Sequence, residues 1–250
     1  MKIVVIGGTG LIGSQLVARL TERGHDAVAA APSTGVDTLT GEGVREALTG
    51  ADVVVDVSNS PNWEDAAVLE FFETSTRTLL AAEAELGVGH HVALSVVGTQ
   101  ALSGAGYFRA KIAQEKLIRE SPVPYSIVHA TQFFEFIQSL AASSTVDGVV
   151  RVAPILLQPI ASVDVAALVA DVALGEPVGG IVEIAGPETF PLAEVIRMRL
   201  GDDAEIAVDP AVGYIGAAVE ERTLVPGEGA RLGQVRFESW LSSASGSQRA

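Results

Sequence analysis

Short runs of consecutive apolar residues alternate along the chain with longer segments whose apolar positions recur every three or four residues. Continuous apolar runs are typical of strands buried on both faces, and the longer pattern indicates helices that cover them. This alternation predicts an α/β fold with a doubly wound parallel sheet. The expected strands are Lys2 to Ile6, Ala27 to Ala31, Ala51 to Val57, His91 to Val97 and Tyr125 to His129, with a rudimentary strand near Val36. The expected helices are Ser14 to Glu22, Gly43 to Leu48, Glu64 to Leu86 and Tyr107 to Glu120.

The second half of the chain has shorter elements and more turn signals than the first. Pairs such as Asp147-Gly148 and Gly186-Pro187 interrupt it, and one well-marked helix begins at Ser162 and stops at Gly175. We therefore expect a core domain over residues 1–145 and a smaller C-terminal lobe, on the substrate side, over residues 146–241. The small polar residues 242–250 predict a flexible tail.

Charge and composition narrow the range of partners. Of the 250 residues, 31 are acidic and 16 are basic, and the net charge of -15 repels nucleic acids and anionic membranes. The stretch from Leu86 to Phe108 is uncharged, but its His, Ser and Gly residues argue against a membrane span. Since there is no cysteine and no histidine spacing typical of a metal site, we expect no metal. We expect a cytoplasmic protein that acts on a small molecule, and the sequence leaves its oligomeric state open.

A glycine-rich turn follows the first strand directly. Its glycines match both G-x-G-x-x-G and G-x-x-G-x-x-G, and a helix starts at once. Such a strand, turn and helix let the backbone approach a pyrophosphate, whose charge is stabilised by the first amides of the helix. A tight structural turn is the alternative, but the context predicts a Rossmann-type dinucleotide site. The expected contacts are Gly7, Thr9, Gly10, Leu11, Ile12 and Gly13, and Gly13 also lets the helix pack against the strand.

The end of the second strand bears on which dinucleotide binds. NAD sites usually place Asp or Glu there, about 20 residues after the turn, to hold the ribose 2′-hydroxyl. This chain has Pro32, Ser33 and Thr34 instead, and both hydroxyls can donate hydrogen bonds to a 2′-phosphate. The missing acid favours NADP(H) over NAD(H), although no arginine stands there to pair with the phosphate.

Tyr107 and Lys111 are the candidates for proton chemistry. Their spacing puts both side chains on one face of the expected helix. Because a nearby ammonium stabilises a phenolate, Lys111 would let Tyr107 act as a general acid/base during hydride transfer to a carbonyl. Ser95 lies near the carboxyl end of a central strand and would stabilise the developing oxyanion. The alternative is a half-buried Tyr, a solvated Lys and a Ser satisfied by the backbone.

With these motifs the chain resembles the short-chain dehydrogenase/reductase superfamily, and in particular its atypical NmrA-like NAD(P)H-binding branch. The resemblance covers nearly the whole chain, including the glycine turn, the Ser, Tyr and Lys motif, and residues 124–128 and 184–188. It implies that Asp37 contacts the adenine and that Ser58 and Asn59 lie near the nicotinamide ribose, which Lys111 also holds. It also implies a substrate cleft near Phe133 and Phe134, which either line the substrate or belong to the core.

The chain departs from this family at one point that concerns the cleft. His129-Ala130 stands where many relatives have Arg-Pro. Some NmrA-like proteins have lost the Tyr and become redox sensors, whereas this chain keeps Tyr107 and Lys111. We therefore expect an NADP(H)-dependent oxidoreductase that acts on a carbonyl, alcohol or quinone-like molecule. The alternatives are a catalytically silent NAD(P)H-binding regulator and an epimerase or isomerase that keeps its cofactor bound.

Overall fold

A seven-stranded parallel sheet forms the centre of the computed structural model, which describes residues 1–247. The strand order is β2-β1-β3-β4-β5-β9-β12. The apolar run of β1 explains its place in the interior of the sheet, because Ile3, Val4 and Val5 are fully buried between the parallel neighbours β2 and β3. The strands are β1 (Lys2–Ile6), β2 (Asp26–Ala30), β3 (Val53–Asp56), β4 (His90–Val96), β5 (Tyr125–Ala130), β9 (Gly180–Ala185) and β12 (Arg231–Leu232).

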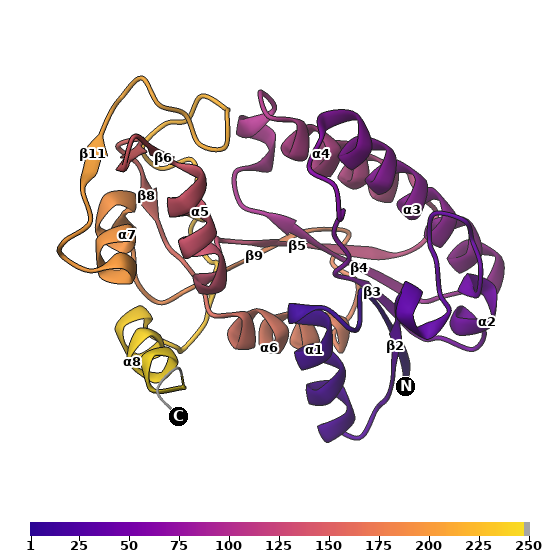
Figure 1. Ribbon diagram of the computed structural model, residues 1–250. Helices are drawn as coiled ribbons and strands as arrows, with labels where there is room; N and C mark the ends of the chain where they lie inside the picture. The colour runs from indigo at the N-terminus through magenta and orange to yellow at the C-terminus, as the bar shows by residue number, and fades with distance from the viewer. Residues whose placement is uncertain (248–250) are drawn as a thin grey trace. The chain divides into compact units, whose positions relative to one another are not determined.

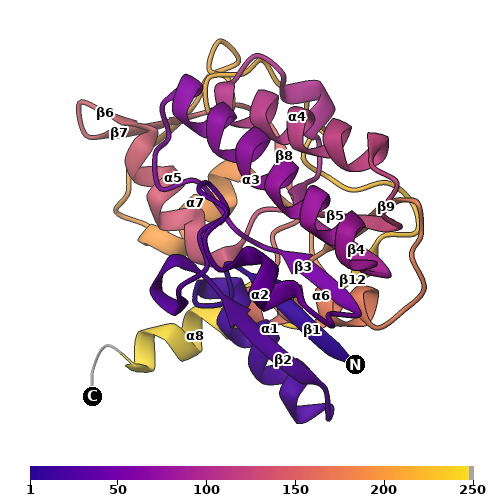
Figure 2. The same cartoon turned by 90° about the vertical axis from the view of Figure 1, so that its right-hand side faces the viewer.

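Helices cover both faces of this sheet (Figures 1 and 2). Helices α3 (Asp65–Leu86) and α4 (Gly106–Glu120) pack side by side over one face, and the short α2 (Val44–Leu48) packs against α3. Helix α1 (Leu11–Glu22) and the last two turns of α6 (Ser162–Ala173) lie over the other face. An ion pair of 2.6 Å between Arg23 and Asp171 joins the end of α1 to α6.

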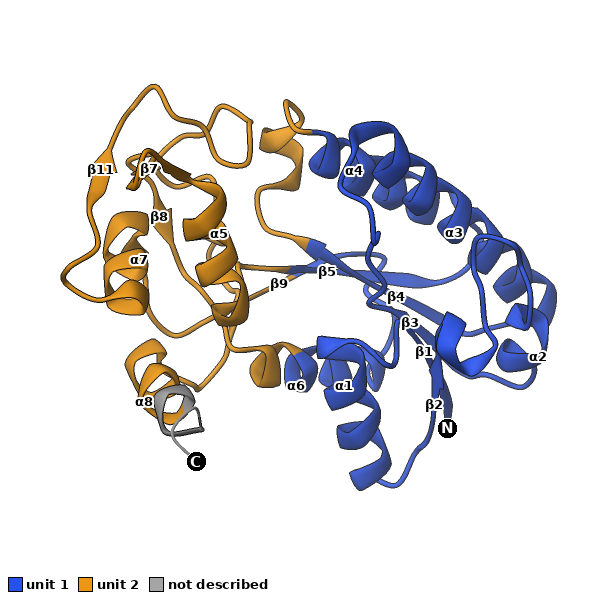
Figure 3. Cartoon of the chain, in the orientation of Figure 1, with its two compact units in different colours: residues 1–95, 106–129, 166–182 blue, residues 96–105, 130–165, 183–250 orange. Residues whose placement is uncertain are grey.

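The chain divides into two compact units that alternate along the sequence (Figure 3). Unit 1 consists of residues 1–95, 106–129 and 166–182, and unit 2 of residues 96–105, 130–165 and 183–250, described to residue 247. Unit 2 contains two small sheets of its own, with strand orders β11-β7-β6 and β10-β8. Its further elements are α5 (Ile137–Ser143), β6 (Thr145–Val146), β7 (Val149–Val152), β8 (Leu156–Leu157), β10 (Phe190–Pro191), α7 (Leu192–Leu200), β11 (Ile206–Val208) and α8 (Phe237–Ser247).

Most of the elements expected from the sequence are present within a few residues of their expected ends. The rudimentary strand near Val36 is an exception, because residues 31–52 form the short 3-10 helix Pro32–Thr34, turns and α2, with no strand. The sequence indicated one domain boundary near residue 145, whereas the two units alternate along the chain. Helix α8 extends to Ser247, into the segment expected to be a tail, and residues 248–250 lie outside the described part.

Candidate functional site

The turn between β1 and α1 is built from glycines that the fold itself requires. Gly7 has a φ of +75°, which favours glycine, and its amide donates to the carbonyl of Ala30. A Cβ on Gly8 would lie 2.7 Å from the Cα of Ala29, and one on Gly13 would lie 2.1 Å from the carbonyl oxygen of Gly7. Gly13 therefore allows close packing of α1 on Gly7 and Gly8 of the turn, whereas the sequence predicted packing against the strand.

Gly10 is different, because its backbone conformation does not require a glycine and its surroundings are more open than those of Gly8 and Gly13. It has extended dihedral angles just before α1, and the only atom within 4 Å of a Cβ built there is the carbonyl oxygen of Gly7, at 3.3 Å. Gly10, Thr9 and Leu11 are all exposed, while Ile12 is buried. The first amides of a helix have no acceptor within the helix and stabilise an anion. An open, side-chain-free approach to these amides fits a dinucleotide pyrophosphate.

The segment expected to select the nucleotide uses most of its polar groups internally. Thr34 accepts a hydrogen bond from the amide of Ala31 at 2.9 Å, and its hydroxyl lies 3.0 Å from the Ala31 carbonyl, so it holds the turn instead of pointing at a phosphate. Asp37 is half-buried and accepts hydrogen bonds from the amides of Leu39 and Thr40. Ser33 is exposed. The prediction for Thr34 as a phosphate donor is therefore corrected, while Ser33 stays a candidate.

Lys111 is the buried cation of the site. Its side chain is 2% exposed, and its ammonium donates to the carbonyl of Leu94 at 2.8 Å and to the side-chain oxygen of Gln114. The ammonium also lies over the ring of Phe72, 4.3 Å from the centroid. Burial lowers the pKa of Lys111 to about 8, although the charges of Asp56 and Glu115 oppose this effect. Lys111 is therefore not the solvated lysine that the sequence left open as an alternative.

A chain of hydrogen bonds joins Lys111 to Ser58, one of the residues expected near the nicotinamide ribose. Gln114 accepts from Lys111 and donates from Nε2 to Oδ2 of Asp56 at 3.0 Å. The other oxygen of Asp56 accepts from the amide of Ser58 at 2.9 Å and from its hydroxyl at 2.6 Å. Asn59, also expected there, is exposed and accepts from the amide of Ser60.

Tyr107 lies one helical turn before Lys111 and contacts aromatic rings. Its ring centroid is 5.2 Å from that of Trp63, 6.1 Å from that of Phe72 and 5.5 Å from that of Phe108. Because Phe72 contacts both Tyr107 and Lys111, these two side chains share a face of α4. Burial raises the pKa of Tyr107 to about 12, so the hydroxyl keeps its proton at neutral pH.

Ser95 does not have the free hydroxyl that the sequence led us to expect. It is buried, and its hydroxyl donates to Oε1 of Glu115 at 2.6 Å. The same oxygen lies 2.8 Å from Nε2 of His129, and Arg119 pairs with the second oxygen at 2.9 Å. Burial opposes the negative charge, but these partners outweigh it and lower the pKa of Glu115 to about 2. Ser95 thus belongs to a buried ionic network, which corrects its expected role as an oxyanion donor.

The two phenylalanines expected near the substrate differ in exposure. Phe134 is 1% exposed and packs against Phe237 and Trp240, with centroids 4.9 and 5.5 Å away. Phe134 is therefore a core residue of unit 2, and of the two roles that the sequence left open, substrate lining or core, it has the second. Phe133 is half-buried and stacks on the exposed Phe136 at 5.5 Å.

Several polar residues of the site were missed by the sequence analysis. Gln114 and Glu115 follow Lys111 by three and four positions, so the helical period places them beside it on α4. Asp56 is the last residue of the buried strand β3, and ligands of parallel sheets usually bind at the carboxyl ends of the strands. Trp63 had no signal, because its contact with Tyr107 depends on the fold of the loop before α3.

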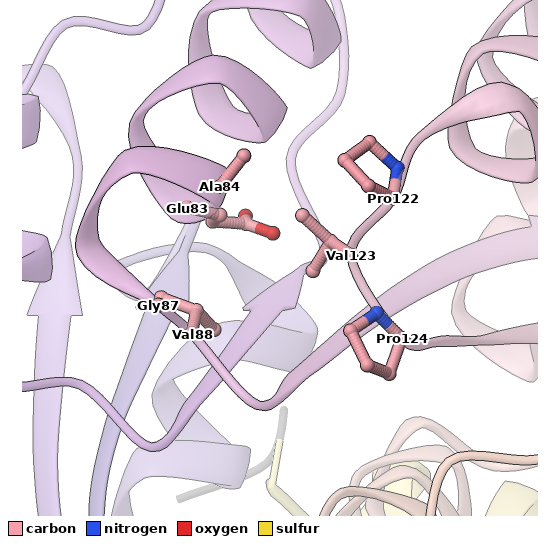
Figure 4. Close-up of a pocket in the computed structure, with 7 residues that line it drawn as sticks. All are labelled: Glu83, Ala84, Gly87, Val88, Pro122, Val123 and Pro124. Carbon is pink, nitrogen blue, oxygen red and sulfur yellow. The ribbon is translucent and has the colours of Figure 1, made fainter.

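A separate cavity of about 200 Å³ lies at the amino ends of the strands, near the start of β4 (Figure 4). Its lining comes from the end of α3 and from the loop that precedes β5, and it includes the buried Glu83. Both oxygens of Glu83 lie within 3.0 Å of Nδ1 of His91. Within residues 1–247, no group of three or more His, Asp or Glu side chains is arranged to hold a metal ion.

Comparisons with known proteins agree with the nucleotide site. The model of the NAD(P)H-binding family matches residues 7–174. The photosystem II assembly factor Ycf39 of Cyanophora paradoxa is 26% identical over 149 residues, which cover 54% of this chain and 46% of Ycf39. The 4-hydroxy-tetrahydrodipicolinate reductase of Natronomonas pharaonis is 28% identical over 144 residues, covering 56% and 48%. The chain thus spans about half the length of the curated relatives it matches.

A solved structure covers the chain more completely. A short-chain dehydrogenase/reductase superfamily protein of Agrobacterium tumefaciens with bound NAD has a TM-score of 0.73 and 16% identity, covering 100% of this chain and 97% of that one. This likeness is one of fold. None of the helices in the described residues is long and apolar enough to cross a membrane. The match over two thirds of the chain, together with the open glycine turn before α1, shows that the protein belongs to the NAD(P)H-binding family.

Proposed function

We propose that this protein is an NADPH-dependent reductase of the NmrA-like type, acting on a carbonyl or quinone-like small molecule. The observation that supports this best is the pairing of Tyr107 and Lys111 on one face of α4, against Phe72. One side chain holds a proton firmly at neutral pH, and the other is a buried cation one helical turn away. This is the arrangement of groups that reduction of a carbonyl needs.

The nucleotide would be held by residues of unit 1. The turn around Gly10 and the first amides of α1 would bind the pyrophosphate, and Ser33 the 2′-phosphate. Ser58 and Asn59 would lie near the nicotinamide ribose. A reduced nicotinamide supplies a hydride when bound. In the balanced reaction the carbonyl carbon would gain that hydride and its oxygen a proton, with one proton taken from solvent and the oxidised nucleotide as the second product.

Tyr107 would give its hydroxyl proton to the carbonyl oxygen as negative charge develops there. With a pKa of about 12, Tyr107 is protonated at neutral pH, as the proton donor of a reduction must be. It is also a weaker acid than an ordinary phenol, so release of the proton would depend on stabilisation of the phenolate. The charge of Lys111 would stabilise the phenolate that remains until solvent returns the proton. Glu115 and His129 would act indirectly, because they fix the buried polar layer beneath α4.

Replacing Tyr107 by Phe tests the proposal, because it removes one oxygen and leaves the ring contacts in place. We expect kcat for NADPH oxidation with a carbonyl substrate, followed at 340 nm, to fall by about two to four orders of magnitude. NADPH affinity should change little. Tyr125→Phe is the matched control, since Tyr125 lies at the start of β5, away from the carboxyl ends of the strands, and should keep full activity. Full activity in Tyr107→Phe would refute the proposed acid.

A non-catalytic NAD(P)H-binding regulator is the second candidate function. Two observations favour it: the hydroxyl of Ser95 is engaged by Glu115, and part of the chain is similar to an assembly factor. A regulator would bind NADPH with normal affinity but reduce no carbonyl or quinone compound. Calorimetric titration of NADPH, combined with a screen of such compounds for NADPH oxidation, separates the two functions.

A further inference from the structure

Trp63 is an exposed aromatic side chain in contact with Tyr107. Its side chain is 63% exposed, the largest exposed fraction of any large apolar residue in the described part of the chain. Its ring centroid nevertheless lies 5.2 Å from that of Tyr107, with 30° between the ring planes. The indole therefore contacts the ring of the proposed proton donor while much of the residue is open to solvent.

The loop that presents Trp63 is held in place on both sides. Before it, the hydroxyl of Ser60 donates to the carbonyl of Asn62 at 2.7 Å, and the side-chain oxygen of Asn62 accepts from the amide of Glu64 at 2.9 Å. After it, Asp65 forms an ion pair with Arg109 of α4. A Cβ on Gly106 would lie 1.8 Å from Oδ1 of Asp65, so the missing side chain at Gly106 lets this carboxylate reach the start of α4.

The ring contacts of Tyr107 are all aromatic, and the charged side chains of Asp65 and Arg109, near the start of α4, are paired with each other. The three rings that contact it belong to Trp63, Phe72 and Phe108. The nearby ammonium of Lys111 is buried and already donates to Leu94 and Gln114. A carboxylate or phosphate on a substrate would gain little from these neighbours, whereas a flat conjugated molecule can stack on an exposed indole.

We propose that Trp63 determines substrate specificity by stacking flat, conjugated carbonyl compounds, quinones in particular, beside Tyr107. This inference rests on the proposed reductase function; it assigns a specificity-determining residue and narrows the substrate class to flat, conjugated compounds. The indole would orient the ring plane of the substrate and bring a ring carbonyl to the hydroxyl of Tyr107. A small aliphatic carbonyl compound has no ring to stack and would gain nothing from Trp63.

Two substrates with the same reacting group test the selectivity. Phenanthrene-9,10-quinone and butane-2,3-dione are both 1,2-dicarbonyl compounds, but only the first has a flat aromatic surface. We expect Trp63→Leu to lower kcat/KM for the quinone about tenfold, the range of an aromatic stacking contact with its buried area. The value for the dione should stay within about twofold. Trp63→Phe, which keeps a ring, should retain most of the quinone activity. Equal losses for both substrates, or no loss for the quinone, would overturn the assignment.

Binding without turnover separates this inference from the reductase proposal. The chain has two tryptophans, so Trp240→Phe leaves Trp63 as the single indole emitter. In this variant we expect phenanthrene-9,10-quinone, added without nucleotide, to quench the emission saturably, and butane-2,3-dione to leave it unchanged. Trp63→Leu, which keeps Trp240, reports quenching that does not involve Trp63. Saturable quenching with no turnover of any carbonyl would support the stacking site and refute the reductase. No saturable quenching would overturn the stacking site whatever the turnover.

Discussion

The buried charge of Lys111 should make the stability of this protein depend on pH in a way that one substitution removes. Burial lowers the pKa of Lys111 from its ordinary 10.5 to about 8. Since each pKa unit corresponds to about 1.4 kcal/mol, keeping this ammonium charged costs about 3 kcal/mol of folding free energy at neutral pH. Lys111→Met cannot carry the charge and so has no such cost.

The direction of the effect follows from which state binds the proton more strongly. The unfolded chain holds the proton of Lys111 up to a pH near 10.5, whereas the folded protein releases it near pH 8. The cost is therefore complete below pH 8 and fades as the pH rises towards 10.5. Between pH 7 and pH 10, the free energy of unfolding of the wild type should rise by about 2.5 kcal/mol relative to that of Lys111→Met.

Urea unfolding of both proteins at intervals between pH 7 and pH 10, followed by circular dichroism, measures this difference. Other groups that titrate in this range are present in both proteins, so their contributions cancel in the comparison. Lys116→Met is the matched control, because Lys116 lies on the same helix with its side chain 71% exposed and should follow the wild type. If the curves of wild type and Lys111→Met run parallel over this range, Lys111 is not a desolvated cation and its proposed action on Tyr107 loses its basis.

Three further predictions concern the nucleotide site and the buried network. Gly10→Val should abolish NADPH binding in calorimetric titration while circular dichroism shows a folded protein, because a Cβ there meets only the carbonyl oxygen of Gly7, at 3.3 Å, which must shift slightly; unchanged affinity would refute the pyrophosphate site. The wild type should bind NADPH more tightly than NADH, and Ser33→Asp should reverse this order by repelling the 2′-phosphate; a wild type that prefers NADH would contradict the assignment. The lowered pKa of Glu115 contributes about 3 kcal/mol of stability, which is present above about pH 4.5 and lost as the pH falls towards 2. Glu115→Gln should therefore lack this acid-dependent loss when both proteins are unfolded in urea. An identical loss in both proteins would count against the network.

Local patterns were sufficient to predict the central sheet and the glycine turn. The run of β1 is apolar at every position that is buried, and Gly7 and Gly13 are placed where close packing demands them. The missing strand near Val36 could not be read in this way, because a few apolar residues in a short connection fit a turn as well as a strand.

Partners of polar side chains were harder to predict than the elements that bear them. The sequence placed Ser95 at the end of a strand, but its hydrogen bond depends on Glu115, which is 20 residues away on a helix that packs over the sheet. The contact of Trp63 with Tyr107 likewise spans 44 positions. Such contacts are determined by tertiary packing, so they cannot be predicted from the periodicity of the sequence.

The amide of Gln114 joins two buried groups of opposite charge, and this constrains how the chain can change during evolution. Its oxygen must face the ammonium of Lys111 and its nitrogen the carboxylate of Asp56, so the amide cannot be flipped without losing both hydrogen bonds. Glutamate has the same shape but would set two carboxylates against each other, and leucine would remove one hydrogen bond from each buried charge. Positions 56, 111 and 114 should therefore change together in descendants of this protein, as one inherited unit.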